Sequence, residues 1–257
     1  MTKTARPELV TIPCLQDNYA FLVHDPDTGD TALVDAPEAA PIQAELDARG
    51  WRLTDILITH HHGDHVDGVA ALRGDARVIG AAADLERLPP LDLAVDEGDA
   101  ITVAGQAVHV LDVPGHTEGH IAFHMPQAGY VFTADSLMAL GCGRLFEGTA
   151  WMMWDSLQKL RALPDHTLVC SGHEYTSANA RFALSIDPEN PDLILRVKEI
   201  EAARAAGQPT VPSTLAEEKR TNPFLRADLP QLKAALGMDD ALAVDVFAEV
   251  RARKDRF

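Results

Sequence analysis

Hydrophobic and polar positions over the first two-thirds of the chain form short apolar or alternating runs, a pattern typical of β-strands. The runs are ELVTIP (8–13), YAFLVHD (19–25), TALVDA (31–36), DILIT (55–59), ARVIG (76–80), AITVAG (100–105), AVHVLDV (107–113), HIAFHM (120–125), YVFTAD (130–135) and TLVCSG (167–172). Two helical patterns interrupt them, one over 38–50 and one around 66–72. The first should end at Gly50, because glycine is the usual residue at a helix C-terminus.

From about Thr176 the period of the pattern changes to that of helices. Helices are predicted over 177–186, 191–207, 214–220 and 240–254, separated by links that contain proline or glycine. Strands with intervening helices, followed by helices alone, indicate an α/β fold with layered sheets and a C-terminal helical subdomain.

Composition limits the kind of protein. The 257 residues are 46% hydrophobic, which suits a globular chain with a substantial core. No apolar run approaches the roughly 18 residues of a membrane span, and the N-terminal MTKTARPELVTIPC lacks the apolar region of a signal peptide. Three scattered cysteines, Cys14, Cys142 and Cys170, form no disulfide framework and suit a reducing cytosol.

The net charge of −17 argues against nucleic-acid binding, which depends on neutralising phosphates with Lys and Arg. The C-terminal RARKDRF is a local exception, because it carries four basic residues and one acidic residue.

The densest group of candidate ligands is LITHHHGDHVDG, residues 57–68. It contains His60-x-His62-x-Asp64-His65 immediately after a predicted strand. In an extended segment His60 and His62 point to the same side, whereas His61 points away. Neutral imidazoles and a carboxylate are ligands that Zn, Fe(II) and Mn accept, so the segment predicts a metal site.

Three further ligand-type residues follow other predicted strands. His116 lies in VPGHTEGH, Asp135 in VFTADS and His173 in VCSGHEY. Binding residues collect at such positions, where a rigid scaffold holds a loop. Six or seven candidates exceed the three or four protein ligands of one zinc ion, so two metals are predicted.

These motifs resemble those of the metallo-β-lactamase superfamily. The resemblance lies in T-H-H-H-x-D-H (59–65), G-H-T (115–117), T-A-D (133–135) and G-H-E-Y (172–175). The segments PCLQDNYAFLV, CGRLFEGT and STLAEEKRTNPFLR are more narrowly similar to the glyoxalase II, or hydroxyacylglutathione hydrolase, family. The likeness extends over nearly the whole chain.

The resemblance implies a four-layer αββα sandwich, with a catalytic domain over 1–175 and a helical substrate-binding subdomain over 176–257. It assigns His60, His62 and His116 to one metal and Asp64, His65 and His173 to the other. Asp135 would bridge both, and Asp64 and Asp135 would act in catalysis with a metal-bridging hydroxide. Asp35 resembles the carboxylate that orients a ligand imidazole. Two divalent ions are expected, with zinc preferred and iron or manganese also compatible.

By the same resemblance, glutathione would contact Arg144, Tyr175, Arg251 and Lys254. Two positions depart from the family pattern CGKFYEGT, because Arg144 replaces a lysine and Phe146 replaces a tyrosine, with loss of a hydroxyl. Arg251 and Lys254 also have a simpler interpretation, since cations at the end of a helix complement its dipole.

The predicted function is that of a cytoplasmic thioester hydrolase in methylglyoxal detoxification, which releases glutathione and D-lactate from S-D-lactoylglutathione. A glutathione thioester is the expected small-molecule partner, without nucleic acid or membrane, and a monomer is expected. The alternatives are a mono-iron persulfide dioxygenase of the same superfamily, which the NPFLR-containing tail argues against, and a non-catalytic metal-dependent binding protein.

Overall fold

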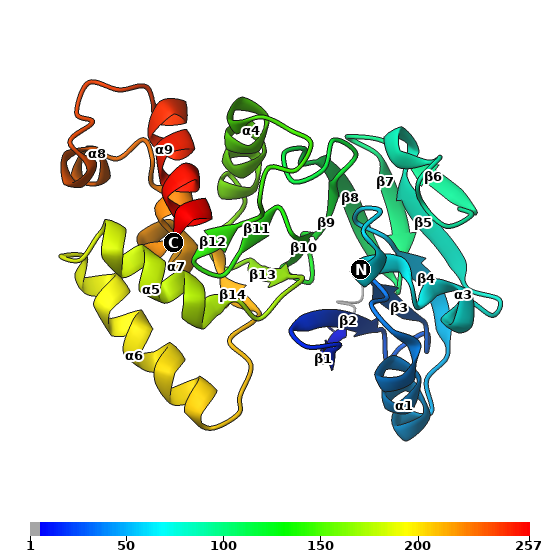
Figure 1. The fold of residues 1–257 in the computed structure, drawn as a ribbon. Helices are drawn as coiled ribbons and strands as arrows, with labels where there is room; N and C mark the ends of the chain where they lie inside the picture. Colours follow the sequence, from blue (N-terminus) through cyan, green and yellow to red (C-terminus); the bar gives the residue numbers. More distant parts are fainter. Residues whose placement is uncertain (1–5) are drawn as a thin grey trace. The chain divides into compact units, whose positions relative to one another are not determined.

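The computed structural model of the protein describes residues 6–257 (Figure 1). The predicted absence of a signal peptide concerns the N-terminus, whose residues 1–5 lie outside the described part. The chain forms two compact units, of which the first takes in the described residues through Asp112 together with Gly119–Ala134. The second comprises Val113–Glu118 and Asp135–Phe257. Each unit combines two separate segments of the chain, so the units do not coincide with the predicted domains over 1–175 and 176–257. The predicted functional division at residue 175 stays a prediction.

The first unit contains a six-stranded mixed sheet. Its strands are β1 (Glu8–Cys14), β2 (Asn18–His24), β3 (Thr31–Val34), β4 (Leu53–Leu57), β5 (Arg77–Ala81) and β6 (Leu93–Val95), in that order. β1, β2 and β3 are antiparallel, whereas β3 to β6 are parallel. Since parallel strands end at the same edge of a sheet, the segments that follow β3, β4 and β5 emerge together there.

Helices cover one face of this sheet. The crossover from β3 to β4 contains α1 (Ala39–Arg49), and the crossover from β4 to β5 contains α2 (Gly63–Val66) and α3 (Val69–Leu72). Ile42 and Leu46 of α1 pack with Leu22, Leu33 and Ile56 of the strands in one buried cluster. As predicted, α1 ends at Gly50, whose φ of 68° is left-handed.

The other face of the sheet meets a second sheet within the same unit. β7 (Ala100–Val103), β8 (Gln106–Asp112), β9 (Ile121–Met125) and β10 (Tyr130–Ala134) form an antiparallel meander. Phe21 of β2 and Phe132 of β10 meet with ring centroids 5.7 Å apart. Because Leu22 faces the helices and its neighbour Phe21 faces the second sheet, strand alternation produces the layering that the sequence predicts.

The second unit is mainly helical. Its elements are β11 (Leu137–Met138), β12 (Gly141–Cys142), α4 (Ala150–Arg161), β13 (Leu168–Ser171), α5 (Thr176–Ile186), α6 (Pro191–Ala205), β14 (Ser213–Thr214), α7 (Leu215–Thr221), the 3-10 turn η2 (Pro223–Leu225), α8 (Pro230–Leu236) and α9 (Ala243–Arg256). The four helices predicted for the tail are present, whereas β11, β12, α4, β14 and α8 were not predicted. α5 and α6 lie side by side and share a buried cluster that includes Ala183 and Leu193 (Figure 1).

Candidate metal and substrate site

The histidine-rich segment follows β4 at the carboxyl edge of the first sheet. His60 and His65 are fully buried, while His62 is half-buried. His60 Nε2 and His62 Nδ1 lie 3.1 Å apart. Two imidazole nitrogens bound to one tetrahedral zinc would lie about 3.3 Å apart, given Zn–N distances of about 2.0–2.1 Å. This pair of donors therefore fits a metal ion.

Asp35 fixes the orientation of two of these rings. It follows β3, is 3% exposed, and accepts hydrogen bonds from Thr59 N and Thr59 Oγ1, both at 2.9 Å. His65 Nδ1 contacts Asp35 Oδ2 at 2.8 Å, and His60 Nδ1 contacts Thr59 Oγ1 at 3.0 Å. With each Nδ1 as donor, the two Nε2 atoms keep the lone pairs that a metal requires.

Two contacts around this segment were not predicted. Asn18, at the start of β2, donates from Nδ2 to the main-chain oxygen and to Oδ2 of Asp64, both at 3.0 Å. The buried Asp84, which follows β5, holds His61 Nδ1 at 2.8 Å. Only the position of Asp84 after a strand signalled a role, and nothing in the sequence singled out Asn18. The bond to Asp84 supports the expectation that His61 lies outside the ligand set.

The second unit brings together the three other predicted ligands. His116, Asp135 and His173 are 3%, 6% and 4% exposed. Asp135 Oδ2 lies 3.4 Å from His116 Nε2, and Asp135 Oδ1 lies 3.3 Å from His173 Nε2. The two imidazoles therefore lie next to different oxygens of one carboxylate. This arrangement is expected of a carboxylate that bridges two ions.

Contacts with the main chain of residues 143 and 144 hold His116 and Asp135 in place. His116 Nδ1 contacts the main-chain oxygen of Arg144 at 2.8 Å, and Gly143 N donates to the main-chain oxygen of Asp135 at 2.9 Å. A Cβ on Gly143 would lie 2.2 Å from that Asp135 oxygen and 2.8 Å from His116 Nδ1. Only glycine therefore fits at position 143 without displacing Asp135 or His116.

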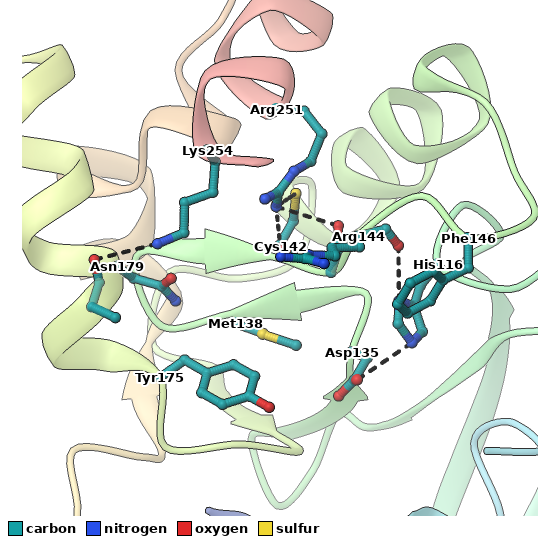
Figure 2. A pocket seen from close by; sticks show the side chains of 12 residues that line it. His116, Asp135, Met138, Cys142, Arg144, Phe146, Tyr175, Asn179, Arg251 and Lys254 are labelled. Carbon is teal, nitrogen blue, oxygen red and sulfur yellow. Dashed lines mark hydrogen bonds and ion pairs between the residues drawn. The ribbon is translucent and has the colours of Figure 1, made fainter. Parts of the chain in front are cut away.

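One cavity of about 390 Å³ in the second unit contains all four predicted substrate contacts (Figure 2). It is lined by His116, Asp135, Met138, Cys142, Gly143, Arg144, Phe146, Tyr175, Ala178, Asn179, Arg251 and Lys254. Two candidate ligands and three cations thus share one lining. Asn179 was not predicted, and its Nδ2 donates to the main-chain oxygen of Ala139 at 3.0 Å.

Lys254 is a cation of this cavity whose surroundings disfavour its charged form. Burial, reinforced by the positive charges of Arg251, Arg181 and Arg144, lowers the pKa of Lys254 from 10.5 to about 8. Its Nζ donates to the main-chain oxygen of Ala178 at 3.3 Å. An anionic ligand would relieve the repulsion among these cations.

The aromatic lining is partly open. Phe146 is 62% exposed, and its ring centroid lies 5.2 Å from that of His116. Tyr175 stacks on His173 with centroids 4.7 Å apart and planes 6° apart. Cys142 is a free thiol whose pKa burial raises to about 11, which keeps it protonated at neutral pH.

Comparisons with known proteins agree with this fold and these residues. Residues 15–173 match the family model described as the metallo-beta-lactamase superfamily, and residues 174–257 match the hydroxyacylglutathione hydrolase C-terminus. A solved B3 metallo-beta-lactamase, BLEG-1, has a TM-score of 0.66 and 20% identity over 85% of this chain and 99% of its own. TTHA1623 in a di-iron-bound form has a TM-score of 0.61 and 28% identity over 85% of this chain and 100% of its own.

The fold and the histidine–aspartate clusters thus define a member of the metallo-β-lactamase superfamily, whose clusters are able to hold metal ions. The predicted α/β sandwich is confirmed. Curated hydroxyacylglutathione hydrolases of Jannaschia sp. and Ruegeria pomeroyi are both 67% identical, over 98% and 97% of this chain and 100% and 99% of their own. The chain belongs to the hydroxyacylglutathione hydrolase family, which confirms the resemblance seen in its motifs.

Within residues 6–257, no helix combines the length and the apolar character needed to cross a membrane.

Proposed function

We propose that this enzyme hydrolyses the thioester bond of S-D-lactoylglutathione and of related 2-hydroxyacylglutathiones, with release of glutathione and D-lactate. The cavity of the second unit is the observation that carries the proposal. It places His116 and Asp135, two candidate metal ligands, in the same lining as the cations Arg144 and Lys254. A substrate with a reactive acyl group at one end and carboxylates at the other matches this distribution of charge. The hydroxyacylglutathione hydrolases that share 67% of its residues support the assignment.

The seven ligand candidates would hold two divalent ions. His60, His62 and His116 would bind one ion, Asp64, His65 and His173 the other, and Asp135 both. The distances within each unit support this, and the combination of the two sets rests on the family resemblance. The di-iron-bound form of TTHA1623 supports a count of two. Zinc is the expected metal, and iron or manganese suits the same ligands. When bound, the ions supply a water of lowered pKa and polarise the acyl oxygen.

The chain's own residues orient the reactants. Asp35, Thr59 and the main-chain oxygen of Arg144 hold the ligand imidazoles in the tautomer that leaves Nε2 free for a metal. In the reaction, the water oxygen bonds to the acyl carbon and the carbon–sulfur bond breaks, with its electron pair passing to the sulfur as thiolate and the protons of the water being released to solvent. Because the glutathione thiolate is a stable leaving group, the chain needs no strong general acid next to the sulfur.

The two alternative functions are less well supported. The match of residues 174–257 to the hydroxyacylglutathione hydrolase C-terminus favours the hydrolase over a persulfide dioxygenase. A substrate-sized cavity that combines two candidate ligands, His116 and Asp135, with cations argues against a non-catalytic binding protein. The three buried free cysteines suit a reducing cytoplasm, where the enzyme would take part in methylglyoxal detoxification.

The test is a spectrophotometric thioester assay on protein whose metals have been quantified. We expect hydrolysis of lactoylglutathione near neutral pH without nucleotide or flavin. In parallel, oxygen uptake is measured with glutathione persulfide. Oxygen consumption without thioester hydrolysis would replace the proposed function by the dioxygenase alternative, and neither activity would favour a binding protein.

Lys254→Ala is expected to weaken binding of the glutathione thioester. A charge-assisted hydrogen bond contributes about 1.5–3 kcal/mol, so its loss should raise KM by roughly 10- to 150-fold. Since Lys254 lies in the cationic part of the cavity, kcat should change less. Steady-state kinetics with lactoylglutathione and with a small thioester that lacks carboxylates measures both effects. An equal loss with both substrates would contradict a direct contact.

The same lysine predicts a pH dependence. Its pKa of about 8 means that its charge is lost as the pH rises through 8, so KM for lactoylglutathione should increase between pH 7.5 and 9. Lys254→Arg keeps its charge throughout this range, because a guanidinium does not deprotonate there. A KM that rises equally in the unaltered enzyme and in Lys254→Arg would assign the effect to another group.

A further inference from the structure

The segment STLAEEKRTNPFLR (213–226) carries part of the family resemblance but lies away from the substrate. The structure describes this segment in full, and none of its residues lines the substrate cavity. Two of its polar side chains, Glu218 and Asn222, are fully buried. Because a buried carboxylate or amide is costly without hydrogen-bond partners, the partners of these two side chains indicate what the segment does.

Both side chains hold the turn of the β11–β12 hairpin. Asn222 Nδ2 donates to the main-chain oxygens of Met138 and Gly141, at 3.1 and 3.0 Å. Leu140 N donates to Glu218 Oε2 at 2.9 Å, and Asn222 Nδ2 lies 3.1 Å from the same oxygen. Two buried side chains thus bind three consecutive main-chain positions of the turn and its flanks, from about 80 residues further along the chain.

The turn needs this support because its backbone is unfavourable. Leu140 has a φ of 55°, in the left-handed region that favours glycine and costs free energy in a bulky residue. The Leu140 side chain is fully buried in the cluster that α5 and α6 share. This burial and the bond to Glu218 stabilise a conformation that a leucine seldom adopts.

The same hairpin connects the candidate ligand Asp135 to the segment that holds it. Asp135 stands two residues before β11, and Gly143 follows β12 and donates from its N to the main-chain oxygen of Asp135 at 2.9 Å. The next carbonyl, that of Arg144, contacts His116 Nδ1 at 2.8 Å. Both strands also contribute side chains to the cavity lining (Figure 2). A shift of the hairpin would therefore displace two candidate ligands.

We infer that Asn222 and Glu218 are positioning residues that fix the β11–β12 hairpin, and through it Asp135 and His116, for metal binding. The inference rests on the proposed function for the role of these two ligands. Partners that hydrogen-bond to ligating groups typically contribute 10- to 100-fold to metal affinity. Asn222 acts one step further from the ligands, so the expected contribution is about tenfold, at the lower end of that range.

Ser213 offers a matched control within the same network. Its Oγ donates to Glu218 Oε1 at 2.6 Å, whereas Leu140 N binds the other oxygen, Oε2. The guanidinium of Arg196 pairs with Oε1 as well. Ser213→Ala therefore weakens the network but removes no hydrogen bond to the hairpin.

The test compares Asn222→Ser with Ser213→Ala. Serine keeps an oxygen that can cap η2, as Asn222 Oδ1 now does by accepting from Phe224 N at 3.0 Å, but it has no amide group for the hairpin carbonyls. Asn222→Asp has the shape of asparagine without the amide donors, and it replaces the serine variant if serine prevents folding.

Three measurements are made on each variant. Zinc affinity is measured by competition with a chromophoric chelator. kcat and KM are measured with lactoylglutathione and with a small thioester that lacks the glutathione carboxylates. Melting temperatures show how far each variant is destabilised.

Asn222→Ser should bind zinc about tenfold more weakly and lose kcat with both substrates. Ser213→Ala should retain the zinc affinity of the unaltered enzyme, even where its melting temperature falls as far. Asn222→Asp should resemble Asn222→Ser, because a carboxyl group donates at most one hydrogen bond, and only when it is protonated.

Unchanged zinc affinity in the Asn222 variants would overturn the inference, whether only the melting temperature fell or only KM for lactoylglutathione rose. An equal loss of zinc affinity in Ser213→Ala would also overturn it, because the loss would then follow the stability of the network and not the bonds to the hairpin. If the unaltered enzyme did not hydrolyse thioesters, the proposed function would fail, whereas the chelator competition would still decide the role of Asn222.

Discussion

Replacing Asp135 by alanine is expected to remove most of the bound metal and to lower kcat/KM by more than about 100-fold, since even the outer partners of metal ligands contribute 10- to 100-fold. The carboxylate oxygens of Asp135 lie 3.4 Å from His116 Nε2 and 3.3 Å from His173 Nε2. Its loss would remove the group proposed to join the two ions. Elemental analysis and steady-state kinetics on the same preparation measure the effect.

The main chain of Asp135 provides a reason to expect that the variant folds. The bond from Gly143 N is made to the main-chain oxygen of Asp135, so Asp135→Ala preserves it. His61→Ala is the matched control, because His61 lies within the histidine-rich segment but contacts Asp84. It should lose much less metal and activity than Asp135→Ala. The reverse order would move His61 into the ligand set and Asp135 out of it.

Removal of metal is expected to abolish thioester hydrolysis, and addition of divalent metal should restore it. The nucleophile and the polarisation of the acyl oxygen both depend on bound ions, and no side chain in the cavity is proposed to replace them. Elemental analysis of the fully reconstituted enzyme should approach two transition metals per chain. Zinc should also raise the melting temperature, because ligands that bind the folded state stabilise it.

The metal count is tested most sharply with variants of the second predicted ligand group. Asp64→Ala and His173→Ala should each reduce the number of bound metal ions towards one per chain and lower the rate of thioester hydrolysis. A firm limit of one ion in the unaltered enzyme, with Asp64 and His173 dispensable for hydrolysis, would refute the two-metal proposal. Far-UV circular dichroism of the metal-free protein separates loss of catalysis from loss of fold.

The candidate ligands could be predicted from the sequence because their signal is local. A run of strand-forming residues followed by His or Asp places the side chain at a strand end, whatever the rest of the chain does. His60, Asp135 and His173 were found in this way. Asn18 and Asp84 were not, because each reaches the histidine-rich segment from a position 46 or 23 residues away in the chain.

Three of the secondary-structure elements that the sequence did not predict have similar explanations. β14 consists of two residues and pairs with β13, more than 40 residues earlier. Only that distant pairing makes it a strand. α8 spans seven residues between Pro230 and Gly237, too few to show a clear helical period. α4 places four large apolar or aromatic side chains within its first five residues, AWMMW, which obscures the polar face.

The sequence by itself determined the fold class, the family and the set of ligand candidates, because side-chain chemistry and strand or helix periodicity are properties of short segments. Only the tertiary structure decided how residues that look alike in the sequence differ in their contacts. Arg251 and Lys254 stand three apart on one helix, yet Arg251 meets the carbonyls of Cys142 and Gly143 while Lys254 faces a cluster of cations. The burial, hydrogen-bond partners and charge of each side chain depend on segments more than 70 residues away, and packing alone brings those segments together.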